Sequence, residues 1–125
     1  MLGQFTDDQN MSILRTLVCQ IRPVEVIVGS ELRNSSVIKM LKNSPIVPIF
    51  NYLTPDKCYG FTKTCVELEK YFGENLEEWP KVLGNFKRDE KWIGFEAVGM
   101  TIAFLTDALI DQETLKTGMY SEYNP

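Results

Sequence analysis

Apolar side chains recur at helical spacing near the start of the chain. Residues 6–21 place an apolar residue at every third or fourth position, which predicts an amphipathic helix. Thr6 with Gln9 fits a capping box, and Asp7 and Asp8 stand where the helix dipole favours negative charge. The predicted apolar face consists of Met11, Leu14, Leu17, Val18 and Ile21.

Short apolar runs predict the strands of a small sheet. VEVIV at 24–28 is rich in β-branched residues and suits a buried parallel strand. IVPIF at 46–50 predicts another strand, in which Pro48 indicates an edge or a bulge because it lacks an amide donor. LGQF at 2–5 has the pattern of a short strand, and 51–56 is a turn-forming stretch.

Helical periodicity returns between and after these strands. Residues 35–43 form the second predicted helix, with Asn34 or Ser35 as its N-cap. Residues 61–72 form the third, and Gly73 is a natural residue to end it. We expect the inward faces of these two helices to comprise Val37, Ile38, Leu41, Phe61, Cys65, Leu68 and Phe72.

The last third of the chain is predicted to be mainly helical. A short helical piece and a charged loop follow Gly73. Residues 95–109 are apolar on nearly every side, which is typical of a helix buried among other elements. The order of elements predicts an α/β fold with a small, mostly parallel sheet flanked by helices.

Composition narrows the possible functions. A chain of 125 residues, 44% hydrophobic and 24% charged, is typical of one globular domain. Its net charge of −4 argues against binding DNA or an anionic membrane by itself. The longest apolar stretch, around 97–105, is too short for a membrane span.

The sequence contains no histidine, which removes the commonest general base and the usual zinc ligand sets. Three cysteines without a CxxC pair indicate free thiols in a reducing compartment.

Candidate chemistry was sought at the ends of the predicted strands. The junction at 22–36 contains neither a phosphate loop nor a GxGxxG fingerprint, so a plain scaffold corner is favoured. Asp7 and Asp8, taken with Asp56, are similar to the Mg²⁺-binding acids of response-regulator receiver domains, which makes a receiver-like phosphoacceptor domain the alternative function. A nuclease would need several strand carboxylates, and Glu25 is the only acid within a predicted strand.

Three stretches occur in an informative order. Arg-Pro-Val-Glu at 22–25 joins a helix to a strand, Tyr-Phe-Gly at 71–73 ends a helix, and a small-residue helix around Gly99 runs into LIDQE at 109–113. In this order they resemble the connector domain, or domain II, of the MutS family of DNA mismatch repair proteins. Within that family, GQFTDD at 3–8 and LIDQE are most similar to the eukaryotic sixth MutS homologues.

The resemblance implies a fold and a mechanical role. The family's connector domain has an RNase H-like fold without catalytic carboxylates, and here it would lack its first strands, so that residues 2–5 pair weakly or stand as an exposed edge. Residues 1–125 would be a connector domain excised from a larger multidomain ATPase. The resemblance implies no catalytic residue, cofactor or metal in this chain, because ATP and Mg²⁺ belong to other parts of the parent protein. The domain would couple mismatch and nucleotide state to domain movement.

The resemblance also implies partners. These are the second MutS homologue subunit, a MutL homologue, and mismatched DNA through the parent protein, in the nucleus and away from membranes. Trp79 and Trp92 are expected either to mark patches covered in the full protein or to be ordinary core or loop residues. The candidate MutL-binding surface is the polar face of the third helix; a solvated helix face is the alternative. Its residues are Lys63, Glu67, Glu69 and Lys70.

Overall fold

A computed structural model describes residues 1–125 and divides them into two compact units. Unit 1 contains residues 1–4 and 56–124, and unit 2 contains residues 5–55. Six α-helices and one two-stranded parallel sheet confirm the predicted α/β class with a small sheet flanked by helices. No helix combines the length and the apolar character needed to cross a membrane.

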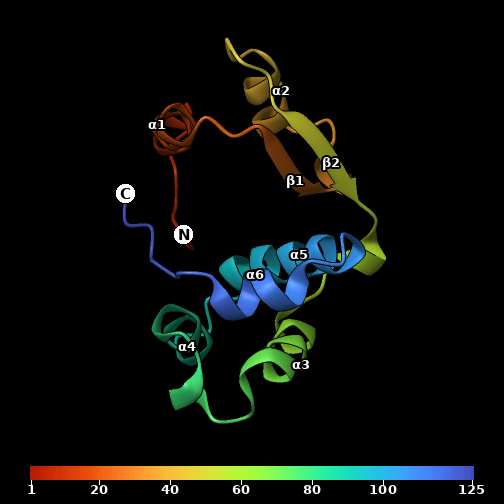
Figure 1. Cartoon of the computed structure of the whole chain (residues 1–125). Coiled ribbons are helices and arrows are strands. Elements are labelled where there is room, and N and C mark those ends of the chain that lie inside the picture. Colours follow the sequence, from red (N-terminus) through yellow and green to blue (C-terminus); the bar gives the residue numbers. More distant parts are fainter. The chain divides into compact units, whose positions relative to one another are not determined.

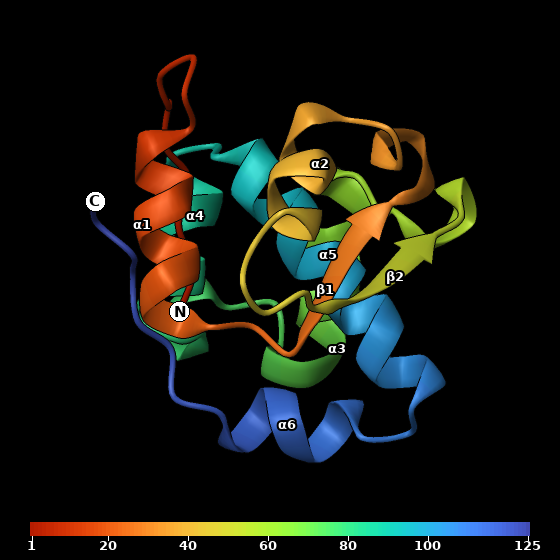
Figure 2. The ribbon, with the colours of Figure 1, turned by 90° about the horizontal axis from the view of Figure 1, so that it is seen from above.

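Unit 2 is built on two adjacent parallel strands, β1 (Glu25–Gly29) and β2 (Ile49–Leu53) (Figure 2). Their register pairs Glu25 with Ile49. Between them lie a 3-10 turn, η1 (Ser30–Leu32), and helix α2 (Ser36–Lys42). The Ser35 hydroxyl caps α2 by accepting the Ile38 amide at 3.4 Å, as the sequence predicted. Helix α2 supplies the buried apolar side chains of this unit, Ile38, Met40 and Leu41.

Unit 1 is helical. Its elements are η2 (Pro55–Lys57), which begins at the unit boundary, α3 (Phe61–Phe72), η3 (Leu76–Glu78), α4 (Lys81–Arg88), α5 (Trp92–Asp107) and α6 (Asp111–Thr117). Helix α5 packs against α3, α4 and α6 (Figure 1). The buried core is formed by Cys65, Leu68, Trp79, Leu83, Phe86, Phe95, Ile102 and Leu115. The predicted bounds of α3 are confirmed, and Gly73 ends it at a φ of +82°.

Two predictions for the N-terminal segment are wrong. Residues 2–5 form no strand, because Leu2 makes only an isolated parallel bridge to Glu122. Helix α1 spans Ser12–Ile21, so the predicted start at residue 6 and the Thr6–Gln9 capping box are incorrect. The Asp7 and Asp8 carboxylates accept amides at 12–14 and so hold the preceding residues in a loop, where short acidic side chains commonly compete with helix formation.

The second strand is displaced from its predicted position at 46–50. It begins at Ile49, whose amide donates to the Val24 carbonyl at 2.8 Å, whereas Pro48 has no amide to donate. The predicted turn at 51–56 is therefore strand as far as Leu53.

The apolar helix predicted at 95–109 occupies Trp92–Asp107 as α5. Leu109, at a φ of +60°, separates it from α6, which the sequence reading did not resolve as a distinct helix. Trp79 is only 4% exposed and belongs to the core of this chain, so it does not mark a patch awaiting a partner. Trp92 is 55% exposed at the start of α5.

Candidate functional site

Three of the four predicted partner-binding residues share one face of α3. Lys63, Glu67 and Lys70 are spaced four and three residues apart, which places them along one side of a helix. The Lys70 ammonium pairs with the Glu67 carboxylate at 3.0 Å. Lys63 lies over the Tyr59 ring, with its ammonium 4.2 Å from the ring centroid. The three side chains therefore form one surface of alternating charge.

Glu69, the fourth predicted residue, has its ion-pair partner on another helix. Its carboxylate lies 4.0 Å from the Lys87 ammonium of α4, on the side of α3 that faces the neighbouring helix. Lys87 in turn lies 5.0 Å from the centre of the buried Trp79 ring. Glu69 thus helps to join α3 to α4, and its role in a partner-binding surface stays a prediction.

The α3 surface also contains an apolar residue that the sequence reading missed. Val66 is 48% exposed and lies between Lys63 and Lys70 at helical spacing. The available signal was its spacing, since Val66 lies three residues after Lys63 and four residues before Lys70. We call Lys63, Val66, Glu67 and Lys70 the α3 surface.

Two of the three acids proposed for a receiver-like site, Asp7 and Asp8, cap the start of α1. The Asp7 carboxylate accepts the amides of Ile13 and Leu14 at 3.0 and 2.9 Å, and Asp8 accepts those of Asn10 and Ser12 at 2.9 and 3.0 Å. Asp56 lies in η2, in a different segment of the fold. No group of three or more His, Cys, Asp or Glu side chains is placed to hold a metal ion.

Hydrogen bonding lowers the pKa of both capping aspartates. At Asp7, partial desolvation raises the pKa, but the amides of Leu14, Ile13 and Asp8 together outweigh it. At Asp8, the Ser12 hydroxyl and the Ser12 amide are the main causes of the lowered pKa. Both carboxylates are therefore ionised at neutral pH, and they accept hydrogen bonds from the amides at the start of α1.

The junction at 22–36 is a turn that joins a strand to a 3-10 helix. Strand β1 ends at the buried Gly29 and continues directly into η1. Farther along, the Arg33 guanidinium lies over the Tyr52 ring, 4.3 Å from its centroid, and so ties the loop to β2. The sequence prediction of a scaffold corner agrees with these contacts.

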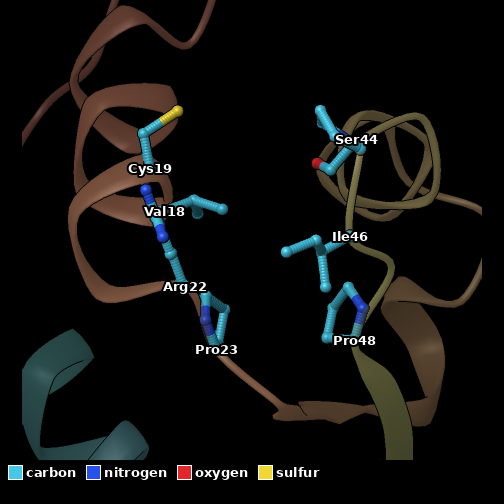
Figure 3. Close-up of a pocket in the computed structure, with 8 residues that line it drawn as sticks. Val18, Cys19, Arg22, Pro23, Ser44, Ile46 and Pro48 are labelled. Atoms are coloured by element: carbon cyan, nitrogen blue, oxygen red, sulfur yellow. The ribbon is translucent and has the colours of Figure 1, made fainter.

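Beside this corner, unit 2 contains an apolar groove of about 400 Å³. Val18, Cys19 and Arg22 of the α1 end form one wall, and Ser44, Ile46 and Pro48 form the other, with Pro23 at the base (Figure 3). The sequence reading did not find this groove. Its signal was the apolar pair Ile46 and Val47, at 70% and 54% exposure, which was assigned to a strand at an edge or a bulge.

Comparison with known proteins relates the chain to mismatch repair. No protein-family model matches it. A DNA mismatch repair protein MSH6 from Saccharomyces cerevisiae is 30% identical over 125 aligned residues, which cover 97% of this chain. The Homo sapiens protein Msh6 is also 30% identical and covers 99% of the chain, and an Arabidopsis thaliana MSH6 is 26% identical over 92% of it. The chain is homologous to a segment of the MSH6 proteins.

This similarity confirms the resemblance to the MutS family that Arg-Pro-Val-Glu, Tyr-Phe-Gly and LIDQE suggested. The MSH6 proteins are far longer than the part that aligns. The chain spans 10% of the length of the yeast and human relatives. The homology therefore extends along nearly all of this chain and over a domain-sized part of MSH6.

Proposed function

We propose that the chain is the connector module of a MutS-type DNA mismatch repair protein and that it acts without catalysing a reaction. The observation that supports the proposal is the alignment of 97–99% of the chain with a tenth of MSH6 proteins from yeast and human. A domain of this size can transmit a change of state when neighbouring domains bias its position.

In this proposal residues 1–125 link the mismatch-binding region of the parent protein to its ATPase and clamp regions. ATP and Mg²⁺ are bound by other domains of the parent, which works in the nucleus as a heterodimer with the second MutS homologue. Mismatched DNA is reached through the parent protein. The net charge of −4 favours protein contacts over DNA binding by this module alone.

The α3 surface is the proposed contact for a MutL homologue. It combines the exposed Val66 with two lysines and a carboxylate, and its Glu67–Lys70 pair is partly exposed, so the pair adds little to folding stability. Exchanging the two charges leaves an ion pair on the helix but reverses the pattern presented to a partner. Such an exchange therefore tests binding with little effect on the fold.

The proposal is tested by calorimetric titration of the 125-residue chain with the N-terminal half of a MutL homologue. We expect saturable binding, and a loss of affinity of about tenfold in Glu67→Lys/Lys70→Glu. The matched control is Lys57→Asp/Asp107→Lys, which exchanges another exposed ion pair of unit 1, 3.2 Å apart in the native chain. This control is expected to retain native affinity.

Duplex DNA with and without a mismatch serves as the competing ligand in the same titration. We expect no binding of either duplex by the isolated chain. The recruitment role is overturned if the folded chain does not bind the MutL fragment, or if both charge exchanges weaken binding equally. Tight binding of DNA by the chain alone would contradict the proposal that mismatched DNA is bound through other parts of the parent protein.

A further inference from the structure

The groove in unit 2 is an apolar surface with one positive charge. Five of the eight lining residues are apolar, and the only charged one is Arg22. The apolar residues are Val18, Pro23, Pro45, Ile46 and Pro48. Its volume of about 400 Å³ is within the range in which proteins hold small ligands and anchoring side chains. Figure 3 shows Val18 and Ile46 directed toward one another from opposite walls.

The apolar character continues beyond the groove. Ile21 and Val24 flank its α1 side at 52% and 78% exposure, and Val47 and Ile49 flank the other side at 54% and 64%. These four residues are neighbours in sequence of the groove residues and add exposed apolar side chains to the same segments of unit 2.

Arg22 is available to a partner. No ion pair includes it, whereas Arg15 donates to the Asn10 carbonyl and Arg33 stacks on Tyr52. Its backbone is held at a φ of +51°, in the left-handed region that normally favours glycine or asparagine. The Arg22 side chain runs along the α1 wall, next to Val18 (Figure 3). A carboxylate bound at this end of the groove would give the guanidinium a charge-assisted partner.

The prolines limit the kind of ligand that the groove can recognise. Pro23, Pro45 and Pro48 have no amide hydrogen, so none of them can donate a backbone hydrogen bond to a peptide. Their rings form rigid apolar walls that lose little freedom on binding. Recognition would therefore depend on side chains of the ligand, two or more of them bulky and apolar.

We propose that this groove binds a protein segment in which adjacent bulky apolar residues lie next to a carboxylate, with the carboxylate paired to Arg22. This site goes beyond the proposed function, because it lies wholly in unit 2 and does not use the α3 surface. The Arg22 guanidinium favours a carboxylate at its end of the groove, and a single carboxylate is enough to pair with it. The net charge of −4 disfavours a membrane or nucleic acid, because these carry negative charge along their whole surface.

The test uses a dye-labelled peptide, Asp-Glu-Leu-Phe-Asp-Leu, titrated with the 125-residue chain and followed by fluorescence anisotropy. We expect saturable binding that weakens as salt concentration rises. One control peptide replaces Leu-Phe with Ser-Ser, and a second replaces each acid with lysine. The lysine peptide is expected to bind up to about fivefold more weakly, the size of effect that one exposed ion pair can supply. The Ser-Ser peptide is expected to bind at least about fivefold more weakly, because it buries two fewer bulky apolar side chains.

Two pairs of chain variants locate the site. Arg22→Asn removes the charge with a residue that tolerates positive φ, and Lys39→Asn removes a matched exposed charge from α2. Ile46→Ser removes an exposed apolar residue from the groove, and Ile93→Ser removes one from α5, at 53% exposure. We expect about threefold to fivefold weaker peptide binding in Arg22→Asn and Ile46→Ser, and native binding in the other two.

The proposal is overturned if the folded native chain does not bind the peptide, or if each groove variant binds as well as its control. Sedimentation of the unliganded chain tests a different occupant, a second copy of the chain. A dimer that Ile46→Ser dissociates would show self-association through the groove and would also overturn the proposal.

Discussion

Gly99 is required by the close approach of α5 to α3. A Cβ atom at this position would overlap the Thr64 Oγ1 atom and would lie 3.0 Å from Tyr59 Cβ and 3.2 Å from the Tyr59 carbonyl oxygen. Thr64 is fully buried, and its hydroxyl has no hydrogen-bond partner. Two helices that meet at a glycine and a buried threonine have little space for any larger side chain.

Gly99→Ala is expected to lower the free energy of unfolding by about 1–3 kcal/mol, because overpacking outweighs the better helix propensity of alanine. Urea denaturation followed by circular dichroism measures this change. Gly60→Ala is the control, since its Cβ would meet nothing within 4 Å. A Gly99→Ala chain as stable as the native one would show that α3 and α5 do not approach closely here.

Asp7 and Asp8 give the N-terminal segment a defined pH response. Their pKa values are lowered in the folded chain by hydrogen bonds to the first turn of α1, against partial desolvation at Asp7. The stabilisation is present above the unfolded pKa of about 4 and is lost as the pH falls through the lower folded values. We expect the amides of Ile13 and Leu14 to exchange hydrogen faster as the pH falls below about 4, after correction for intrinsic rates.

In Asp7→Asn, which weakens the acceptor at neutral pH, the same two amides are expected to exchange faster than in the native chain. Glu31→Gln, an exposed acid in η1 with no role at α1, is the matched control. Unchanged exchange at Ile13 and Leu14 in Asp7→Asn would contradict the capping assignment.

Some residue roles could be predicted from the sequence and others could not. Ser35 and Gly73 follow local rules for helix caps, and both predictions were confirmed. Asp7 and Asp8 were also predicted to lie at the start of the helix. The Asp7 carboxylate, however, accepts the amides of Ile13 and Leu14, which lie farther along the chain than the partners in a capping box. The groove depends on Arg22 and Ile46, which lie far apart in sequence, so local patterns gave no sign that they share a site.

At the scale of elements, Tyr71 joins α3 to α6. Its hydroxyl donates to the Asp111 carboxylate at 2.6 Å, at the first residue of α6. Desolvation and the hydrogen bond to Asp111 raise the pKa of Tyr71 to about 12. Leu115, also from α6, is buried in the core. The Tyr71–Asp111 hydrogen bond and the packing of Leu115 therefore hold α6 against the rest of unit 1.

Tyr71→Phe is expected to lower the free energy of unfolding by about 1 kcal/mol, because it leaves Asp111 without its donor. Since the folded pKa is raised, the stabilisation is present below the unfolded pKa of about 10 and is lost as the pH rises toward 12. Denaturant titration across this pH interval measures the loss, which Tyr71→Phe should reduce; Tyr120, whose pKa is raised by desolvation, contributes to the remainder. An equal loss of stability in both chains would exclude Tyr71 as its source.

The elements that the sequence predicted best are those determined by local pattern. The bounds of α3 follow from apolar spacing with glycine at each end, whereas β2 moved to residue 49 because its first pairing amide lies after Pro48. Residues 2–5 look like a strand, but a strand needs a neighbour along its length, and Leu2 finds only Glu122. Pairing over such a sequence distance is not visible in a local pattern.

At the scale of the molecule, the two units differ in how they are stabilised. Unit 1 has a continuous helical core with Phe86 and Phe95 at 2% and 0% exposure. Unit 2 has a two-stranded sheet, and no residue of α1 is fully buried. Small sheets of two strands are marginally stable by themselves.

We therefore expect β1 and β2 amides to exchange hydrogen faster than those at the centre of α5 under native conditions. Native-state hydrogen exchange measured by NMR tests this ordering residue by residue. Equal protection of Ile27 in β1 and Ile102 in α5 would show that the whole chain opens only as one cooperative unit.

The proposed role of this chain is that of a non-catalytic connector in a mismatch repair protein. Its most direct test is to replace the aligned segment of Saccharomyces cerevisiae MSH6 with this chain and to measure the mutation rate of yeast that lack their own MSH6. The account predicts a rate well below that of the deletion strain, and a rate equal to the deletion strain for the same chimera with Phe95→Asp in its core. A soluble chimera that leaves the mutation rate at the deletion level would contradict the account.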